Sequence, residues 1–212
     1  MSQITEVAWL PLKPDSKDSD AAAALKKIGP DLRAQPGLDG SWHGATIERP
    51  QSAEFVSVWA SEEAYKQAQG SSIRAEAGKL MQELIDTSDP AVKPYHNAFT
   101  LHKPFDTVVV APVVQVTSIF LPAGVDRAAF EAAWEAIVSH LRQNPPDGFV
   151  AGAHGWGLEE VNGAKVFGAF SGWESVEKNA AGQAGIADKF GEILKFTNVF
   201  EVHHTSFKES RQ

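Results

Sequence analysis

The sequence contains no cysteine, which excludes disulfide bonds, thiol nucleophiles and cysteine-ligated zinc. It also lacks any long block of Lys or Arg, and its formal net charge is −8. Nucleic acids and anionic membranes attract proteins through clustered positive charge. We therefore expect neither of them as a partner.

Long hydrophobic segments are missing as well. No apolar run approaches the roughly 20 residues that cross a membrane as a helix. The first ten residues lack the basic segment and apolar stretch of a secretory signal, so we expect a cytoplasmic protein. A chain of 212 residues is long enough to bury a hydrophobic core, as one large domain or two small ones.

What the sequence does contain is an internal similarity at a nearly constant spacing. A repeat of this kind indicates a duplicated structural unit. The matching segments are, at a shift of 111 positions, 9–11 with 120–122, Gly37 with Gly148, 42–44 with 153–155 and 55–59 with 166–170, and, at a shift of 101, Asn97, Phe99 and His102 with Asn198, Phe200 and His203.

Each half has the pattern of a β-α-β-β-α-β unit. Ser61 is a candidate helix N-cap, and Asn162-Gly163 is a strong hairpin signal. The predicted strands are 6–12, 40–48, 53–60 and 97–103 in the first half and 113–122, 149–159, 164–171 and 197–207 in the second. The predicted helices are 18–35, which Pro30 could kink or end early, 62–86, which Gly70 could break, one that begins after Asp126, and 174–195.

This order is the ferredoxin-like arrangement, whose sheet carries helices on one face only. The other face is apolar, and a second sheet can cover it. The predicted fold class is therefore α+β, with two ferredoxin-like repeats whose antiparallel sheets pack into one α/β barrel. The expected repeats are 1–104 and 113–212, joined by a linker over 105–112, in a monomer with an intramolecular barrel or a weak homodimer.

Two segments carry a resemblance to a known family. They are 58–65 (VWASEEAY) and 170–177 (FSGWESVE), in which a strand end and an aromatic residue lead through a small residue and a Glu into a helix. With the Asn-x-Phe patterns at Asn97 and Asn198, the chain resembles the dimeric α/β-barrel superfamily, in its tandem antibiotic-biosynthesis-monooxygenase-like or stress-response-barrel-like form. The resemblance implies cofactor-free oxygenases, cyclases, decarboxylases, haem-degrading enzymes or proteins without known chemistry.

The catalytic residues of that superfamily do not transfer to this chain. Haem-degrading members carry a Trp and, ten residues on, a His on the second helix, and the matching positions here are Ala68 and Gly78. The helix His of the plant polyketide cyclase is also missing. We therefore expect no haem and no other cofactor.

Histidine is the natural acid or base near neutral pH, and two histidines recur at matching positions. His43 matches His154, and His102 matches His203. One member of each pair is a candidate general base in a barrel pocket. The alternative is an inherited, partly buried histidine that hydrogen-bonds to the backbone. Glycines surround His154, which makes it the favoured base.

Aromatic side chains near these histidines would suit a flat aromatic ligand. The candidate substrate-binding residues are Trp156, Trp42, Phe170, Trp59 and Tyr65. No metal site is expected, because the adjacent His203 and His204 point to opposite faces of a strand and no spacing selects carboxylate partners for them. Trp134 lies on an apolar helical stripe and is assigned to the core.

These observations leave two classes of function. The first is a cofactor-independent enzyme that cyclises, decarboxylates, dehydrates or oxygenates an aromatic or polyketide-like molecule of secondary metabolism, with a His base in an apolar pocket. The second is a non-catalytic barrel that binds a small molecule or serves in a stress response. In both classes the expected partner is a hydrophobic or aromatic small molecule.

Overall fold

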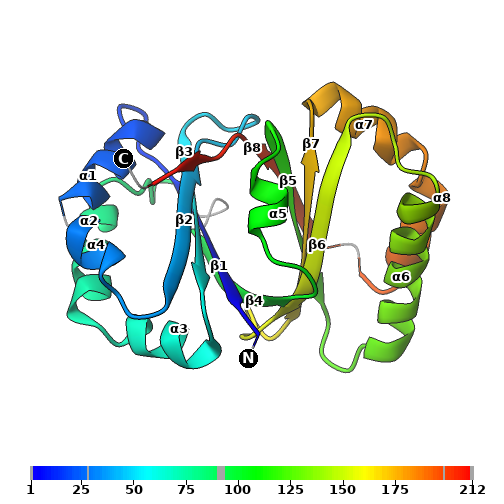
Figure 1. The fold of residues 1–212 in the computed structure, drawn as a ribbon, viewed down its shortest axis with the longest axis horizontal. Helices are drawn as coiled ribbons and strands as arrows, with labels where there is room; N and C mark the ends of the chain where they lie inside the picture. Colours follow the sequence, from blue (N-terminus) through cyan, green and yellow to red (C-terminus); the bar gives the residue numbers. More distant parts are fainter. Residues whose placement is uncertain (1, 28, 90–93, 198, 211–212) are drawn as a thin grey trace. The chain divides into compact units, whose positions relative to one another are not determined.

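The computed structural model describes residues 2–27, 29–89, 94–197 and 199–210 (Figure 1). The chain divides into two compact units. The first comprises Met1–Leu101 together with Thr205–Gln212, and the second comprises His102–His204. The two units are described separately.

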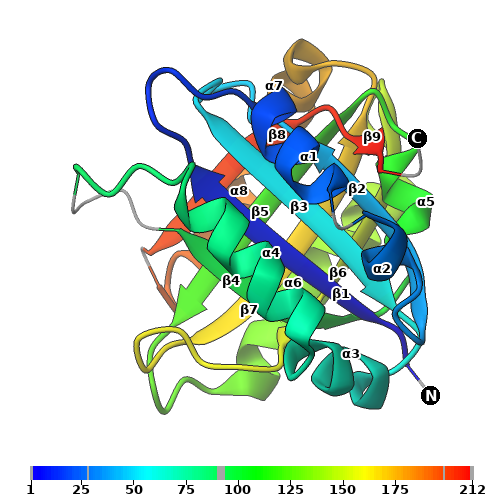
Figure 2. The same ribbon diagram turned by 90° about the vertical axis from the view of Figure 1, so that its left-hand side faces the viewer.

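The first unit is an antiparallel sheet with helices on one face. The strand order is β4-β1-β3-β2-β9. Figure 2 shows the helices lying across the sheet on the side that faces the viewer. The strands are β1 (Ile4–Pro11), β2 (Leu38–Gly44), β3 (Ser52–Trp59), β4 (Tyr95–Leu101) and β9 (Lys208–Glu209), and the helices are α1 (Asp18–Lys26), α2 (Gly29–Arg33), α3 (Glu62–Gln69) and α4 (Ser72–Gln82).

The second unit repeats this arrangement. Its strands are ordered β8-β5-β7-β6, which matches β4-β1-β3-β2 of the first unit one for one. The strands are β5 (Val113–Leu121), β6 (Phe149–Gly157), β7 (Lys165–Trp173) and β8 (Phe200–Thr205), and the helices are α5 (Asp106–Val109), α6 (Arg127–Gln143), α7 (Val176–Ala184) and α8 (Ala187–Ile193). The prediction of an α+β fold with two ferredoxin-like repeats is confirmed.

Local signals in the sequence explain where these elements begin and turn. The hydroxyl of Ser61 accepts a hydrogen bond from the backbone N–H of Ala64 at the start of α3, and Ser175 caps α7 in the same way. Gly37 and Gly148 have φ values of 79° and 77° at equivalent turns, a conformation that favours glycine. The predicted second helix of each half is broken in two, at Gly70 and at Gly185.

The strand pairing corrects the spacing of the repeat. Trp59 lies opposite Ile4, and Trp173 lies opposite Val113. Trp59 therefore corresponds to Trp173, and not to Phe170 as the shift of 111 predicts. The difference is an odd number of residues, so it moves every side chain of the strand to the other face of the sheet. The shift of 111 does hold for β2 and β6, where Leu38 and Phe149 oppose the two tryptophans, and it places His43 and His154 at equivalent positions.

The bounds of the compact units differ from those of the predicted repeats. The predicted linker 105–112 contains α5, whose flanking Phe105 packs edge to face on Phe170 with ring centroids 5.5 Å apart. The last residues of the chain belong to the first unit, where β9 pairs with β2. Asn198, the predicted match of Asn97, lies outside the described residues.

Candidate active site

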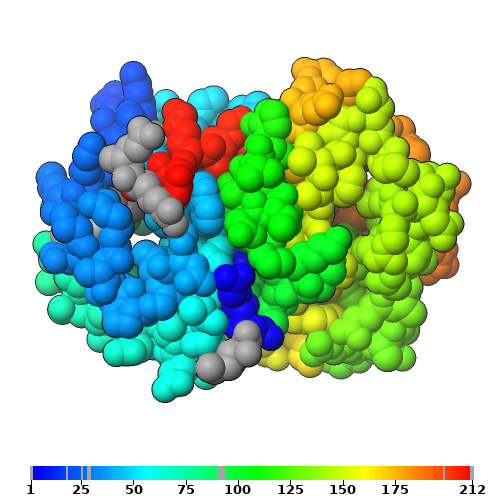
Figure 3. All heavy atoms as spheres, in the orientation of Figure 1, coloured from blue at the N-terminus to red at the C-terminus, as the bar shows by residue number. Residues whose placement is uncertain are grey.

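The second unit contains a cavity of about 680 Å3, which is within the usual size of small-molecule sites. Its walls come from the sheet and from α6, α7 and α8. Figure 3 shows the surface of this unit hollowed between β6 and α6. The apolar part of the lining includes Ile137, Val138, Leu141, Ile186, Phe190 and Phe200.

Two histidines meet at the wall of this cavity. The rings of His102 and His154 stack with centroids 3.8 Å apart and planes inclined by 26°. The backbone N–H of His154 donates to Nδ1 of His102 over 3.1 Å, and the backbone N–H of His102 donates to the carbonyl of His154 over 2.9 Å. Nδ1 of His102 also lies 3.2 Å from the carbonyl oxygen of His154, so this ring nitrogen contacts both backbone polar groups of His154.

The surroundings keep both rings uncharged at neutral pH. Burial, together with the charges of His102 and Lys103, lowers the pKa of His154 to about 4. Burial also lowers the pKa of His102. The ring of His154 lies against the rings of Trp134 and Phe167, at centroid distances of 5.8 Å and 5.6 Å. Its ring nitrogens make no hydrogen bond to the part of the chain that the structure describes, so a lone pair is available to a ligand.

A second polar group on the cavity wall consists of amides. The side-chain carbonyl of Gln115 accepts hydrogen bonds from Asn179, over 2.6 Å, and from Gln183, over 2.5 Å. The Asn179 carbonyl accepts from Gln183 and pairs with Nε2 of His204, each over 2.9 Å. Because Asn179 Oδ1 is the acceptor, Nε2 of His204 carries a proton. These contacts fix the amide orientations on the wall.

The other predicted catalytic histidines lie elsewhere. His43, in the first unit, places Nδ1 3.2 Å from the hydroxyl of Ser210 and stacks on Phe55 with centroids 6.2 Å apart. On β8, Phe200 and Val202 line the cavity, and alternation puts His204 on that face and His203 on the other. The cavity thus brings together His102 and His154 and leaves out His43 and His203.

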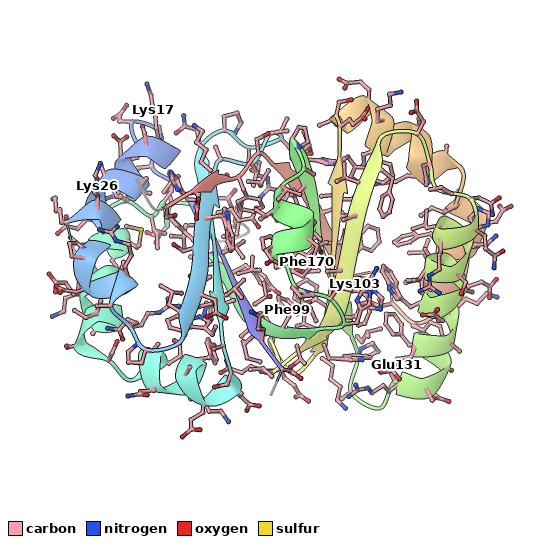
Figure 4. All side chains as sticks on the ribbon, viewed as in Figure 1. Lys17, Lys26, Phe99, Lys103, Glu131 and Phe170 are labelled. Carbon is pink, nitrogen blue, oxygen red and sulfur yellow. The ribbon has the colours of Figure 1, made fainter. Side chains whose placement is uncertain are left out.

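Most of the predicted aromatic residues have structural partners outside the cavity. Trp156 lies on the same face as His154, but Arg127 lies over its ring at 4.5 Å and its Nε1 donates to Glu131 over 2.7 Å. Figure 4 shows Glu131 on α6 and Phe170 beside α5. Phe170 borders the cavity but turns its ring to Phe105, because it belongs to the opposite face of β7.

The remaining predicted residues belong to the first unit. Trp42 lies over Gly40, where an added Cβ would lie 2.5 Å from the indole ring, and Tyr65 is 3% exposed. Trp59 is buried and donates its Nε1 proton to Glu6 over 3.0 Å. None of these three aromatic residues lines the cavity of the second unit.

Trp134, which the sequence assigns to the core, contributes both to the core and to the cavity wall. It packs against Phe130 and Phe167, as a core residue does. It also lines the cavity, and its Nε1 has no hydrogen-bond partner among the described residues. Trp134 is therefore a wall of the site as well as part of the core.

Sequence reasoning missed a buried carboxylate in the first unit. Glu6 Oε2 accepts from Nε1 of Trp59 over 3.0 Å, and Oε1 accepts from Gln69 over 3.0 Å and contacts His96 over 2.7 Å and Arg74. Burial by itself would raise the pKa of Glu6, but the hydrogen bond with His96 and the charge of Arg74 outweigh it and lower the pKa to about 2.

The Glu6 cluster occupies a position in the first unit that is equivalent to the cavity-facing position of Gln115 in the second unit. Glu6 lies opposite Ser57 and Gln115 lies opposite Ser171, at the same distance along the strand from Trp59 and Trp173. The first unit therefore has an ionic cluster where the second has the Gln115 amides. The sequence signal for Glu6 was a single charged residue within a mostly apolar strand.

Neither a metal cluster nor a membrane span is found in the described part of the chain. No group of three or more His, Asp or Glu side chains there could hold a metal ion. No helix among the same residues is long and apolar enough to cross a membrane.

Comparisons with known proteins identify the fold. No protein-family model matches the sequence, and no curated protein matches it. Solved structures do match along the whole chain. An anthrone oxidase-like protein superposes with a TM-score of 0.71 at 14% identity, covering 100% of this chain and 95% of its own.

Two other structures of this fold have different descriptions. A putative monooxygenase from Lactobacillus acidophilus NCFM gives a TM-score of 0.61 at 10% identity, covering 98% of this chain and 94% of its own. A putative chlorite dismutase, TA0507, gives 0.64 at 9% identity, covering 99% and 96%. Proteins of this fold carry different functional descriptions, so the function of this chain has to be inferred from the residues of its site and not from the fold.

Proposed function

We propose that this protein is a cofactor-independent enzyme that oxygenates an aromatic or polyketide-like molecule in the cavity of the second unit. One observation carries the proposal. His154 presents an uncharged ring without a hydrogen bond to the described residues, at the wall of an apolar cavity of about 680 Å3. A general base has to be unprotonated and within reach of the proton that it removes.

The reaction needs a substrate with an acidic C–H group, such as the methylene of an anthrone. His154 takes one proton from that carbon, and the negative charge spreads over the neighbouring carbonyl and rings. The enolate then reduces molecular oxygen, a C–O bond forms at the same carbon, and the peroxide loses water. Anthrone and O2 become anthraquinone and H2O, which balances the atoms and electrons.

The surroundings of His154 favour the reaction mainly by stabilising the enolate that forms, and less by making His154 a strong base. With a pKa of about 4, His154 is a weak base. The positive charge of Lys103 opposes a proton on His154, and an enolate formed beside the ring would offset that charge. Beside apolar walls such an electrostatic contribution is stronger than in water.

The lining of the cavity supports the substrate class. Its aromatic side chains can stack on a planar ligand, and they include Trp134, Phe149, Trp173 and Phe190. The structures that share the fold include an anthrone oxidase-like protein and a putative monooxygenase, but at identities of 14% and 10% they show the fold alone. The proposal therefore depends on the cavity and on His154.

The test is a turnover assay with anthrone in air-saturated buffer. Anthraquinone is measured by chromatography and oxygen uptake by an electrode, each against the spontaneous rate. Ala187→Trp provides a matched variant, because Ala187 lines the cavity from an exposed position on α8 and the added ring would fill the space. We expect turnover in the wild type and its loss in this variant.

Failure would take a recognisable form. If aromatic ligands bind in the cavity and Ala187→Trp blocks them, yet no tested anthrone, quinol or related polyketide turns over, the catalytic proposal is wrong. The non-catalytic binding role is then the better explanation of the cavity.

A further inference from the structure

We infer that the natural ligand of this cavity is an organic acid, with a flat apolar body inside the cavity and a carboxylate held by Lys103 and Arg142. The inference rests on the proposed function and specifies the substrate class of the same site. The inference depends on the sign of the charges around the cavity. The proposed oxygenation does not by itself require a charged substrate.

The charge of the cavity wall is opposite to the charge of the chain. The protein has 27 Asp and Glu residues against 19 Lys and Arg, but the described residues that line the cavity include Lys103 and Arg142 and no Asp or Glu. The remaining polar lining consists of uncharged amides, hydroxyls and the two histidines. A lining whose charged side chains are both cations favours an anionic ligand.

Protein carboxylates do not neutralise these two cations. Lys103 makes no ion pair with the described part of the chain. Arg142 Nη1 lies 3.9 Å from Glu135 Oε1, and both side chains are well exposed, at 66% and 58%. An exposed pair at that distance contributes little, so the guanidinium stays available to a ligand.

Both cations lie on the same side of the cavity as the histidine pair. Lys103 follows His102 directly in the sequence, and Figure 4 shows it beside β6 on the side of α6. Arg142 is in the last turn of α6. Burial has the largest effect on the pKa of His102 and lowers it; the positive charges of Lys103 and Arg142 also lower this pKa, whereas the Glu135 carboxylate raises it. A carboxylate between them would therefore lie close to His102.

A carboxylate is an anion that these two side chains can bind together. The planar guanidinium of Arg142 can bind both oxygens of one carboxylate, and the ammonium of Lys103 adds a third donor. The rest of the wall is apolar apart from the histidines, a few hydroxyls and the amide group of Gln115, Asn179 and Gln183. An acid anchored at the cations places its rings beside His154.

The experiment compares two probes of the same shape, anthracene-2-carboxylate and anthracene-2-carboxamide. Their affinities are measured by isothermal titration calorimetry for the wild type, Lys103→Met, Arg142→Met and the control Lys165→Met. Lys165 is an exposed residue at the start of β7, outside the cavity, so its replacement changes the net charge equally.

We expect the acid to bind the wild type about tenfold more tightly than the amide, the scale of a charge-assisted hydrogen bond. Lys103→Met and Arg142→Met should each remove most of that preference without changing the affinity for the amide. Lys165→Met should leave both affinities as they are. Added salt should weaken binding of the acid and not of the amide.

Two other outcomes overturn the inference and can be told apart. If acid and amide bind equally, and Ala187→Trp blocks both, the cavity binds aromatic ligands with no preference for a negative charge, and the proposed function stands. If neither probe binds the folded wild type, both the inference and the proposed ligand class are wrong. Circular dichroism of each variant verifies that it is folded.

Discussion

The imidazole rings of His102 and His154 are stacked with their centroids 3.8 Å apart, and a backbone hydrogen bond from His154 to Nδ1 of His102 holds them in register. A proton on either ring places positive charge against the other. The relationship therefore makes both the chemistry of the cavity and the stability of the fold sensitive to acid.

The first prediction concerns stability between pH 7 and pH 4. The pKa of His154 is about 4 in the folded protein, whereas its ordinary value is 6.5, so the unfolded chain binds more protons between these values. The free energy of unfolding should fall as pH decreases through this window. Urea unfolding at three pH values, about 7, 5.5 and 4.5, measures the change.

Matched variants isolate the histidine from other acid effects. His154→Gln removes the titrating group and should flatten the pH dependence, whereas His43→Gln, at the equivalent position of the first unit, should not. The same slope in wild type and His154→Gln would show that other groups are responsible.

The second prediction concerns catalysis. If an oxygenation activity is found, His154→Ala should lower turnover by roughly a hundredfold or more, the scale for loss of a general base. His43→Ala should change the turnover little, because the His43 side chain lies outside the cavity and is hydrogen-bonded to Ser210. Steady-state rates with folded variants test this. Similar, small effects from both changes would remove His154 as the base.

The third prediction concerns the buried carboxylate of the first unit. Glu6→Gln should lower the free energy of unfolding at pH 7 by about 1.5–3 kcal/mol, because it removes hydrogen bonds to a charged acceptor. Glu62→Gln is the control, since Glu62 forms an exposed pair with Lys66 that contributes little. Equal losses in the two variants would contradict a structural role for Glu6.

The contribution of Glu6 to the free energy of unfolding should also depend on pH in the acid range. The pKa of Glu6 in the folded protein is about 2, below its ordinary value of 4.5. Its contribution to stability is present above pH 4.5 and is lost as pH falls through 2. Glu6→Gln should therefore lose less stability between pH 4.5 and pH 2 than the wild type does.

The fourth prediction separates backbone strain from crowding at glycines. Gly37 and Gly124 both have positive φ, 79° and 84°, so alanine should cost about 1–2 kcal/mol at either position. A Cβ at Gly37 would also meet Cβ of Ala64 at 2.6 Å, whereas nothing lies within 4 Å of a Cβ at Gly124. Gly37→Ala should cost about 1–3 kcal/mol more. Thermal unfolding of the two variants gives the difference, and equal costs would rule out the crowding.

The sequence predicted part of the candidate site. Its composition and repeat correctly indicated an α+β fold, and glycines near His154 drew attention to a residue that does line the cavity. The repeat marked His102 and His203 as equivalent positions, but it gave no indication that His102 stacks on His154. That contact joins the residue after β4 to the middle of β6, and alternation within one strand carries no information about contacts between distant strands.

The sequence by itself determined the local structure: the order of strands and helices, the caps at Ser61 and Ser175, and the turns at Gly37 and Gly148. These depend on backbone sterics and on hydrogen bonds between residues a few positions apart. Only the tertiary structure decided that Trp59 corresponds to Trp173, that His204 contacts Asn179 of the cavity wall, and that Glu6 is buried and pairs with Arg74 and His96. These depend on strand register, where a slip by one residue turns every side chain to the other face.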